Sequence, residues 1–246
     1  MAKLEIKNVG FSYDGETDVL DNINLSVEAG ELVCVLGTSG CGKSTLFNII
    51  SGLNKPDRGS VSLDGEDITG KAGKISYMLQ KDLLLPYRTI EFNAALPLII
   101  KGENKKSAIK KVQPLFGRFG LEGTQKKYPA ELSGGMRQRA ALLRTYMFSD
   151  NVALLDEPFS ALDTLTRGDI HRWYISMMEE INLTTIFVTH DIDEAILLSD
   201  RICIMRGKPG TFTDEIVIEK KRPRPADFNL TEEFLGYKRL ILEKLR

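Results

Sequence analysis

The chain has 246 residues, which suits one large α/β domain and is enough to bury a sizeable apolar core. Its 33 basic and 34 acidic residues nearly balance, so no bulk charge recruits nucleic acid or anionic lipid. The three cysteines lack metal-ligand spacing, which favours free thiols in a reducing compartment over disulfides or a structural metal site. We expect neither a secretion signal nor a membrane-spanning helix, so work at a membrane would need another chain to cross it.

The first part of the chain predicts a small antiparallel layer. Residues 4–11 and 23–27 alternate between apolar and polar side chains, and a turn-forming Asp14-Gly15 pair lies between them. Such alternation is typical of strands that bury one face.

From residue 32 onward the pattern predicts a buried parallel sheet. Short runs that are apolar on both faces lie at residues 32–36, 152–155 and 185–188, and weaker candidates lie at 74–79 and 201–205. Helical stretches separate several of these runs, which is typical of a doubly wound α/β core.

A helical insertion is predicted inside this core. Residues 86–146 contain no convincing strand, and residues 108–119 and 136–148 have helical patterns. Near the end, Thr231 is expected to cap a helix that runs to Arg246 and packs on the core. We therefore predict one domain with an α/β core at 1–85 and 147–220, an inserted helical subdomain at 86–146, and a helical tail at 221–246.

One motif carries phosphate chemistry. The run from Gly37 to Thr45 fits the pattern G-x-x-x-x-G-K-[ST], directly after an apolar strand and directly before a helical pattern. Lys43 is expected to reach the β- and γ-phosphates, and the Ser44 hydroxyl to ligate Mg²⁺. A glycine loop with an incidental lysine is the competing interpretation. The predicted ATP-binding residues of the loop are Gly37, Thr38, Ser39, Gly40, Cys41, Gly42, Lys43, Ser44 and Thr45.

Two acids after the strand at 152–155 supply what hydrolysis needs besides phosphate binding. Asp156 stands where a buried strand ends and is expected to hold Mg²⁺. Glu157 follows it and is expected to orient or deprotonate the attacking water. A helix cap or salt bridges would be the structural alternative for the pair.

Two further polar residues end strand-like runs. Gln80 closes the run at 75–79, and His190 closes the run at 186–189. Because the carboxyl ends of parallel strands share one edge of a sheet, both are expected to converge with Asp156 and Glu157 on the γ-phosphate. Each residue taken singly is more typical of a structural role.

A second anion site is predicted at the start of the helix near residue 136. Ser133 is a good N-cap, but the glycines Gly134 and Gly135 each disfavour a helical first turn by about 1 kcal/mol relative to alanine. Bare backbone at a helix start allows an anion to approach closely. The chain would then carry two half-sites that two copies could combine head to tail.

With these motifs the chain resembles the nucleotide-binding subunits of ATP-binding cassette (ABC) transporters. The phosphate loop, Gln80, residues 132–138, 152–157 and 160–163, and His190 stand in that family's order and span essentially the whole chain. The resemblance implies a P-loop NTPase fold with a RecA-like, mostly parallel sheet, an antiparallel layer and an inserted helical subdomain.

The same resemblance implies roles for individual residues. Two subunits would enclose two ATP molecules with Mg²⁺, and Ser133, Gly134 and Gly135 would contact the γ-phosphate bound by the other subunit. The implied roles of single residues are adenine stacking by Tyr13, sensing of the metal and the membrane partner by Gln80, coupling of the two sites by Asp163, and contact with the γ-phosphate by His190. A core or strand-surface aromatic explains Tyr13 almost as well.

A finer resemblance is to the nitrate, sulfonate and taurine importer group. Its evidence lies in residues 84–90, 93 and 95–98 and in the proline-containing tail. The chain departs from that pattern at Tyr87, where tryptophan is usual, and at Ala94, where valine is usual. The apolar run 83–86 would receive a helix of the membrane partner, with burial in the chain's own lobe as the alternative.

This group implies import of a small anionic or organic solute. The subunit would bind a separate permease peripherally at the cytoplasmic face of the membrane, and a solute-binding protein would deliver the solute. Competing functions are the ATPase of an ABC exporter, a soluble ABC ATPase of DNA repair or translation, and a P-loop kinase for a small molecule. A kinase would not explain Ser133-Gly134-Gly135 or Glu157.

Overall fold

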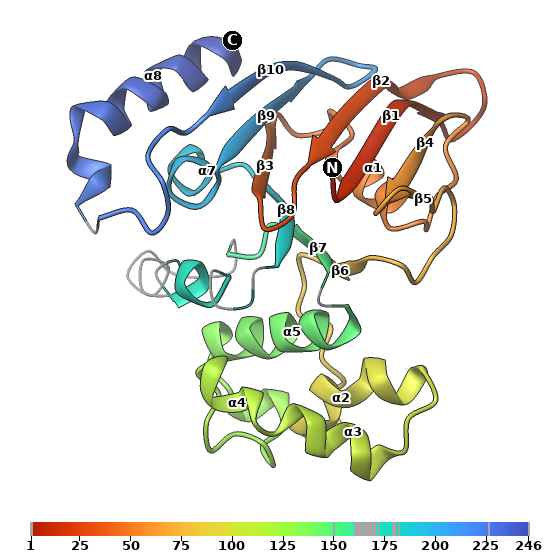
Figure 1. The fold of residues 1–246 in the computed structure, drawn as a ribbon, viewed down its shortest axis with the longest axis vertical. Coiled ribbons are helices and arrows are strands. Elements are labelled where there is room, and N and C mark those ends of the chain that lie inside the picture. Colours follow the sequence, from red (N-terminus) through yellow and green to blue (C-terminus); the bar gives the residue numbers. More distant parts are fainter. Residues whose placement is uncertain are drawn as a thin grey trace.

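The computed structural model describes residues 2–149, 151–159, 171, 173–178, 181, 183–225 and 227–245. Within these residues the chain forms two sheets, a helical lobe and a helical tail. Figure 1 shows the lobe on one side of the main sheet and the tail helix on another. No helix in the described part of the chain has the length and apolarity that crossing a bilayer requires.

An antiparallel sheet forms the start of the chain, as predicted. Its strand order is β2-β1-β4-β5, and β1 pairs with both β2 and β4. Alternate residues of β1, such as Leu4 and Ile6, are buried in an apolar cluster that also contains α1. The bounds are Leu4–Ser12 for β1, Asp18–Val27 for β2, Arg58–Leu63 for β4 and Glu66–Asp67 for β5.

The main sheet of the described residues has the strand order β10-β9-β3-β8-β7-β6. All pairs are parallel except β10 with β9, so the predicted parallel core is confirmed. The bounds are Leu32–Gly37 for β3, Ser76–Met78 for β6, Val152–Asp156 for β7, Thr184–Thr189 for β8, Arg201–Arg206 for β9 and Thr211–Val217 for β10.

Strand β3 shows why these runs are apolar on both faces. Cys34 and Leu36 pack in the cluster that includes the helical lobe, whereas Val33 and Val35 pack in the cluster that includes α1 (Lys43–Ile50). Each face of the strand is covered, and each of these side chains is buried. The sheet is therefore rigidly held between two layers, and its strand ends make a firm base for a site.

The inserted lobe is helical, but one predicted helix in it is wrong. Instead of a single helix over residues 108–119, the chain forms α3 (Lys105–Val112) and α4 (Leu115–Arg118), separated at Pro114. Proline lacks the N–H donor that would continue the hydrogen bonds of the helix, so α3 ends before Pro114 and α4 begins after it. Helix α2 (Ile90–Ile100) was not predicted, because it is apolar nearly all round and lacks a helical period.

The helix that begins after Ser133 and the helix at the end of the chain follow the prediction more closely. Helix α5 (Gly134–Phe148) begins two residues before the predicted start, and a short 3₁₀ turn at Pro129–Glu131 precedes it. Helix α8 (Glu232–Leu245) buries Phe234 and Ile241, and the Thr231 hydroxyl accepts from the Phe234 N–H as the predicted cap. It packs on α7 (Ile192–Leu198) and β9, after a 3₁₀ turn at Phe228–Leu230.

Candidate active site

The phosphate-loop motif leaves β3 and enters α1, as predicted. Gly37 ends β3, and a Cβ atom on it would lie 2.3 Å from the carbonyl oxygen of Met205 in β9. Gly40 and Gly42 have φ angles of +82° and +98°, which residues with side chains rarely adopt. The glycines therefore allow the tight turn against β9 that brings the chain into α1.

The start of α1 combines main-chain donors with one ammonium group. Gly42 caps the helix without a side-chain bond, and the first turn has no acidic residue. Lys43 Nζ donates to the carbonyl oxygens of Gly37 at 2.8 Å and Thr38 at 3.0 Å, which holds the ammonium over the loop. A helix start without a side-chain cap, beside a lysine, suits an anion. Cys41 is buried in the apolar cluster, and its Sγ lies 4.0 Å from Lys43 Nζ.

The two acids occupy the carboxyl end of β7. Asp156 closes the strand, and its Oδ2 lies 3.5 Å from Ser44 Oγ. Burial and the neighbouring charge of Glu157 raise the pKa of the Asp156 carboxyl. A carboxylate in this environment gains from a bound cation, which would stabilise its charged form.

Gln80 and His190 converge on the carboxylate of Glu157. Gln80 Nε2 donates to Oε2 at 2.8 Å, and His190 Nδ1 lies 3.1 Å from Oε1. Glu157 has a φ of +46°, and its N–H donates to the carbonyl oxygen of Val188 in β8. This left-handed backbone conformation is uncommon for glutamate and is typical of functional sites. Three residues that are far apart in sequence thus meet at one carboxylate.

A cavity of about 350 Å³ joins the loop to these strand ends. That volume lies in the range of small-molecule sites. Its lining residues are Val19, Ser39, Gly40, Gly42, Lys43, Ser44, Thr45, Gln80, Asp156, Glu157 and Val188. Val19 and Val188 were not predicted as site residues, because nothing distinguishes them from other strand valines. Gly37, Thr38 and Cys41 belong to the loop but do not line the cavity.

The cavity's donor set fits Mg²⁺ that arrives with a nucleotide. No group of three or more histidine, cysteine or acidic side chains among the described residues could hold a metal. Ser44, Asp156 and Gln80 offer oxygen ligands, and Mg²⁺ is usually held by one or two carboxylates together with substrate phosphates. The metal would therefore complete its coordination with phosphate oxygens.

Tyr13 lies beside the start of α1. Its ring is 65% exposed, so burial in the core is excluded. Its hydroxyl lies 3.2 Å from Thr45 Oγ1, and Phe11 packs edge-on against it at 4.8 Å. An exposed ring held at one end by a hydrogen bond can take a base on its free face, and it also remains a strand-surface aromatic.

The residues that were predicted to form the second anion site lie apart from this cavity. The Ser133 hydroxyl accepts from the Met136 N–H at 3.3 Å and caps α5, and Ser133 is exposed. A Cβ atom on Gly134 would meet only Arg137 Nη2, at 3.9 Å, so the approach to the helix start is open. None of Ser133, Gly134 and Gly135 lines the phosphate cavity of the same chain. Asp163 lies outside the described residues.

The sequence did not reveal a clamp between α5 and the segment after Gln80. Arg137 Nε lies 3.2 Å from Asp82 Oδ2, and Arg144 donates to the carbonyl oxygens of Leu83 and Asp82. Burial lowers the pKa of the Arg144 guanidinium. The two arginines are seven residues apart and share one helix face, which is the one signal that could have suggested a common partner.

Residues 20–160 match the family model described as ABC transporter. The chain belongs to the ABC transporter family. It is 47% identical to the formylaminopyrimidine import ATP-binding protein ThiZ of Halalkalibacterium halodurans, over 84% of this chain and 80% of that protein. It is 44% identical to the aliphatic sulfonates import ATP-binding protein SsuB of Bacillus cereus, over 98% of this chain and 93% of that protein.

Solved structures of ABC proteins share the fold. The structure of cbiO1 from Clostridium perfringens, part of the ABC transporter complex cbiONQ, superposes with a TM-score of 0.81 at 25% identity, covering 99% of this chain and 96% of that one. The dimeric post-hydrolysis state of the cassette MJ0796, bound to ADP and Pi, gives 0.74 at 32% identity, covering 89% of this chain and all of that one. This ABC protein is an ATPase with a P-loop NTPase fold, as the sequence predicted.

Proposed function

We propose that this ABC ATPase drives an importer for a small anionic or organic solute through a separate permease. The observation that carries the ATP-hydrolysing part of the proposal is the convergence of Gln80 and His190 on the Glu157 carboxylate, next to the Lys43 loop. A phosphate-binding protein without hydrolysis would need the loop alone. A carboxylate held by two polar side chains at the loop's mouth is what water activation requires.

The polar residues in and beside the cavity each have a task in this proposal. The loop residues 37–45 bind the phosphates, with Lys43 reaching the β- and γ-phosphates. Ser44, Asp156 and Gln80 hold Mg²⁺, which supplies neutralisation of charge on the phosphates when bound. Glu157 accepts a proton from the attacking water or orients it, and His190 contacts the γ-phosphate. Tyr13 stacks on adenine.

The site of one chain is proposed to be half of the whole. The exposed Ser133, with Gly134 and Gly135, would contact the γ-phosphate bound by a second subunit in a head-to-tail dimer. The separation of these residues from the cavity of their own chain supports this arrangement, as does the dimeric state of the MJ0796 cassette. Asp163 is proposed to couple the two sites.

An apolar groove between the lobe and the core is the proposed seat of the permease. It has a volume of about 440 Å³. Its lining includes Leu53, Leu83 and Ile100, which are 63%, 53% and 75% exposed. In the run 83–86, Leu83 and Leu85 are exposed and Leu84 is buried, so only part of the run belongs to the lobe's own core. A permease helix would cover the exposed part and hold this subunit peripherally at the cytoplasmic face of the membrane.

The relatives named above are import proteins, which favours import over export and over soluble ABC functions. Their solutes, aliphatic sulfonates and formylaminopyrimidine, suggest a small anionic or organic solute delivered by a solute-binding protein. Purification of the chain with its native partner tests transport. A multi-span permease together with a solute-binding protein supports import, whereas a soluble partner refutes transport.

The catalytic assignment is tested with Glu157→Gln. We expect this variant to bind Mg·ATP normally, to lose hydrolysis by roughly 100-fold or more, and to accumulate as an ATP-bound dimer. Adding Ser133→Arg to the same variant should keep nucleotide binding and abolish the dimer, because the longer charged side chain fills the approach to α5. ATP turnover, nucleotide titration and size-exclusion chromatography measure these effects. Unimpaired hydrolysis would overturn the role of Glu157, and an intact dimer would overturn that of Ser133.

A further inference from the structure

The orientation of the His190 side chain depends on how its backbone is held. Its side chain is 67% exposed, and its ring contacts Glu157 at 3.1 Å. The residue lies in a connection of two residues, His190 and Asp191, between the end of β8 and the start of α7. An exposed side chain gets little guidance from packing, so the position of the imidazole follows from how the two ends of this connection are held.

Both ends are held in one ring of hydrogen bonds. The Thr189 hydroxyl donates to Glu194 Oε2 at 2.7 Å and accepts from the Asp191 N–H at 3.0 Å. Asp191 Oδ1 in turn accepts from the N–H groups of Asp193 and Glu194, which caps α7. The ring therefore runs from the residue before His190 to the first turn of the helix after it.

Two of the three residues in the ring are buried, Asp191 is half-buried, and the directions of the hydrogen bonds are fixed. Thr189 and Glu194 are 2% and 4% exposed. A hydroxyl has one proton, so Thr189 can donate to the carboxylate and accept from the N–H only as it does here. Removing the hydroxyl would leave the buried Glu194 carboxylate and the half-buried Asp191 N–H each short of one hydrogen-bond partner, which is costly.

The same carboxylate reaches the strand segment that carries Glu157. Glu194 Oε1 lies 3.4 Å from His171 Nε2, and the His171 ring packs edge-on against Phe159 at 4.8 Å. Phe159 follows Glu157 by two residues. Glu194 thus contacts His190 through Thr189 on one side and the Glu157 segment through His171 and Phe159 on the other.

We propose that Thr189 and Glu194 are positioning residues that hold His190 against Glu157 for ATP hydrolysis. The proposal rests on the role proposed for His190 above. Neither Thr189 nor Glu194 lines the nucleotide cavity, so we expect their effect to pass through His190 and to appear in turnover rather than in ATP binding.

The test compares two substitutions of Thr189. Thr189→Val keeps the shape and removes the hydroxyl, and we expect kcat to fall roughly 10-fold to 100-fold while the Kd for Mg·ATP stays unchanged. Thr189→Ser restores the hydroxyl and should restore most of kcat. The matched control is Thr185→Val. Thr185 lies on the same face of β8, is fully buried and donates to the Leu183 carbonyl oxygen, but stands at the other end of the strand. An equal loss of kcat in the control would overturn the proposal.

A double substitution separates this proposal from the role of His190. If Thr189 acts through His190, then Thr189→Val should cost nothing further in a His190→Ala background. A further loss of the same size there would show that Thr189 acts elsewhere and would overturn the proposal. Full activity of His190→Ala alone would overturn the proposed role of His190, and with it the basis for positioning.

A second variant keeps the proposal testable if Thr189→Val does not fold. Glu194→Gln keeps the side-chain shape and replaces a charged acceptor with a neutral one. We expect it to lower kcat less than Thr189→Val and to leave the Kd for Mg·ATP unchanged, because neutral hydrogen bonds are weaker than charge-assisted ones. A folded Glu194→Gln protein with unchanged kcat would overturn the proposal.

Discussion

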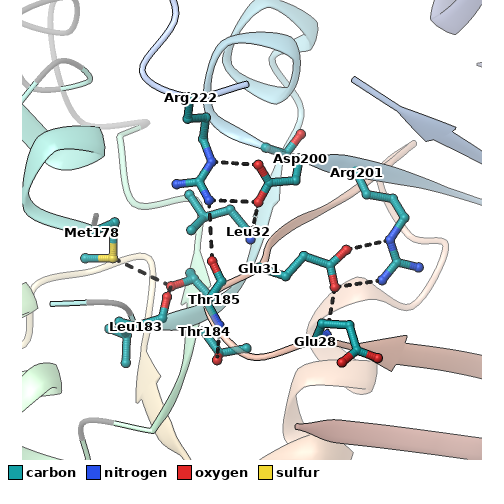
Figure 2. A network of polar contacts seen from close by, with 12 residues as sticks. Glu28, Glu31, Leu32, Met178, Leu183, Thr184, Thr185, Asp200, Arg201 and Arg222 are labelled. Carbon is teal, nitrogen blue, oxygen red and sulfur yellow. Dashed lines mark hydrogen bonds and ion pairs between the residues drawn. The ribbon is translucent and has the colours of Figure 1, made fainter. Parts of the chain in front are cut away.

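The two ends of the main sheet both carry charged clusters, but they are built differently. At the amino ends of the strands the carboxylates of Asp200 and Glu31 each meet an arginine, as Figure 2 shows. Arg222 donates to both oxygens of Asp200 at 2.8 Å, and Arg201 donates to both oxygens of Glu31 at 2.7 and 3.1 Å. At the carboxyl ends, Asp156 and Glu157 stand side by side, and the nearby ammonium of Lys43 is bonded to main-chain carbonyl oxygens.

This difference in pairing separates a structural cluster from a binding site. Asp200 Oδ2 also accepts from the Leu32 N–H, so the Arg222 pair ties the tail to the start of β3 and leaves no charge for a ligand. At the other end, burial and the charge of Glu157 raise the pKa of Asp156, and Asp156 together with burial raises that of Tyr77. A bound cation would relieve the crowding of negative charge there.

The largest effect is expected from Asp156→Asn at the carboxyl end. Removal of this proposed Mg²⁺ ligand should reduce ATP hydrolysis by roughly 100-fold or more. Raising the Mg²⁺ concentration should not restore most of the lost activity. The same substitution should stabilise the nucleotide-free protein at neutral pH. ATP turnover against Mg²⁺ concentration and thermal unfolding without nucleotide are the two measurements.

The sign of the stability change follows from the pKa. Asp156 has an ordinary value of 3.8, and the folded protein raises it. As the pH rises above 3.8 the unfolded chain ionises first, so ionisation of Asp156 costs folding stability at neutral pH. The gain in melting temperature of Asp156→Asn should therefore vanish at a pH below the ordinary value. A variant that melts lower than the parent protein at neutral pH would contradict the comparison between the two ends.

A smaller effect is expected from Arg222→Gln at the amino ends of the strands, where the substitution should lower stability and leave hydrolysis unchanged. It leaves Asp200 without its bidentate partner, and we expect a loss of about 2 kcal/mol in the free energy of unfolding. Hydrolysis per folded molecule should not change. Denaturant unfolding and turnover at a temperature where the variant is folded check both.

The control for this variant is Arg58→Gln. Arg58 also pairs with two carboxylates, Asp18 and Asp21, but its side chain is 47% exposed. The loss of stability should be clearly smaller than in Arg222→Gln, because solvent screens an exposed ion pair. Lower hydrolysis in Arg222→Gln at full folding would show that the amino end takes part in the reaction.

The sequence predicted the elements whose patterns are local. The central strands are continuous apolar runs, and the phosphate loop has fixed spacing between its glycines and Lys43. The rule that parallel strands end at one edge was enough to bring Gln80 and His190 to Glu157. The residue roles themselves and the domain boundaries remain predictions.

The elements that were missed depend on the tertiary structure. Helix α2 is buried nearly all round and therefore shows no helical period, and Pro114 divides the predicted helix over residues 108–119. The clamp of Arg137 and Arg144 on Asp82 joins segments about 60 residues apart, and no local pattern specifies such a pair. Pairings of this kind are set by how the lobe packs on the core.

The smallest effect is expected from a substitution of Asp82 in its clamp with α5. It tests whether an ion pair near the site is only structural. Asp82→Asn removes a half-exposed ion pair with Arg137, so the loss of stability should be about 0.5 kcal/mol. Asp64→Asn, which removes the exposed pair with Lys3, should cost a similar amount. The clamp joins the segment after Gln80 to α5, so kcat should fall by about twofold in Asp82→Asn and stay unchanged in Asp64→Asn. Equal turnover in the two variants would mean that the ion pair of Asp82 and Arg137 is only a structural contact, although it lies beside the site.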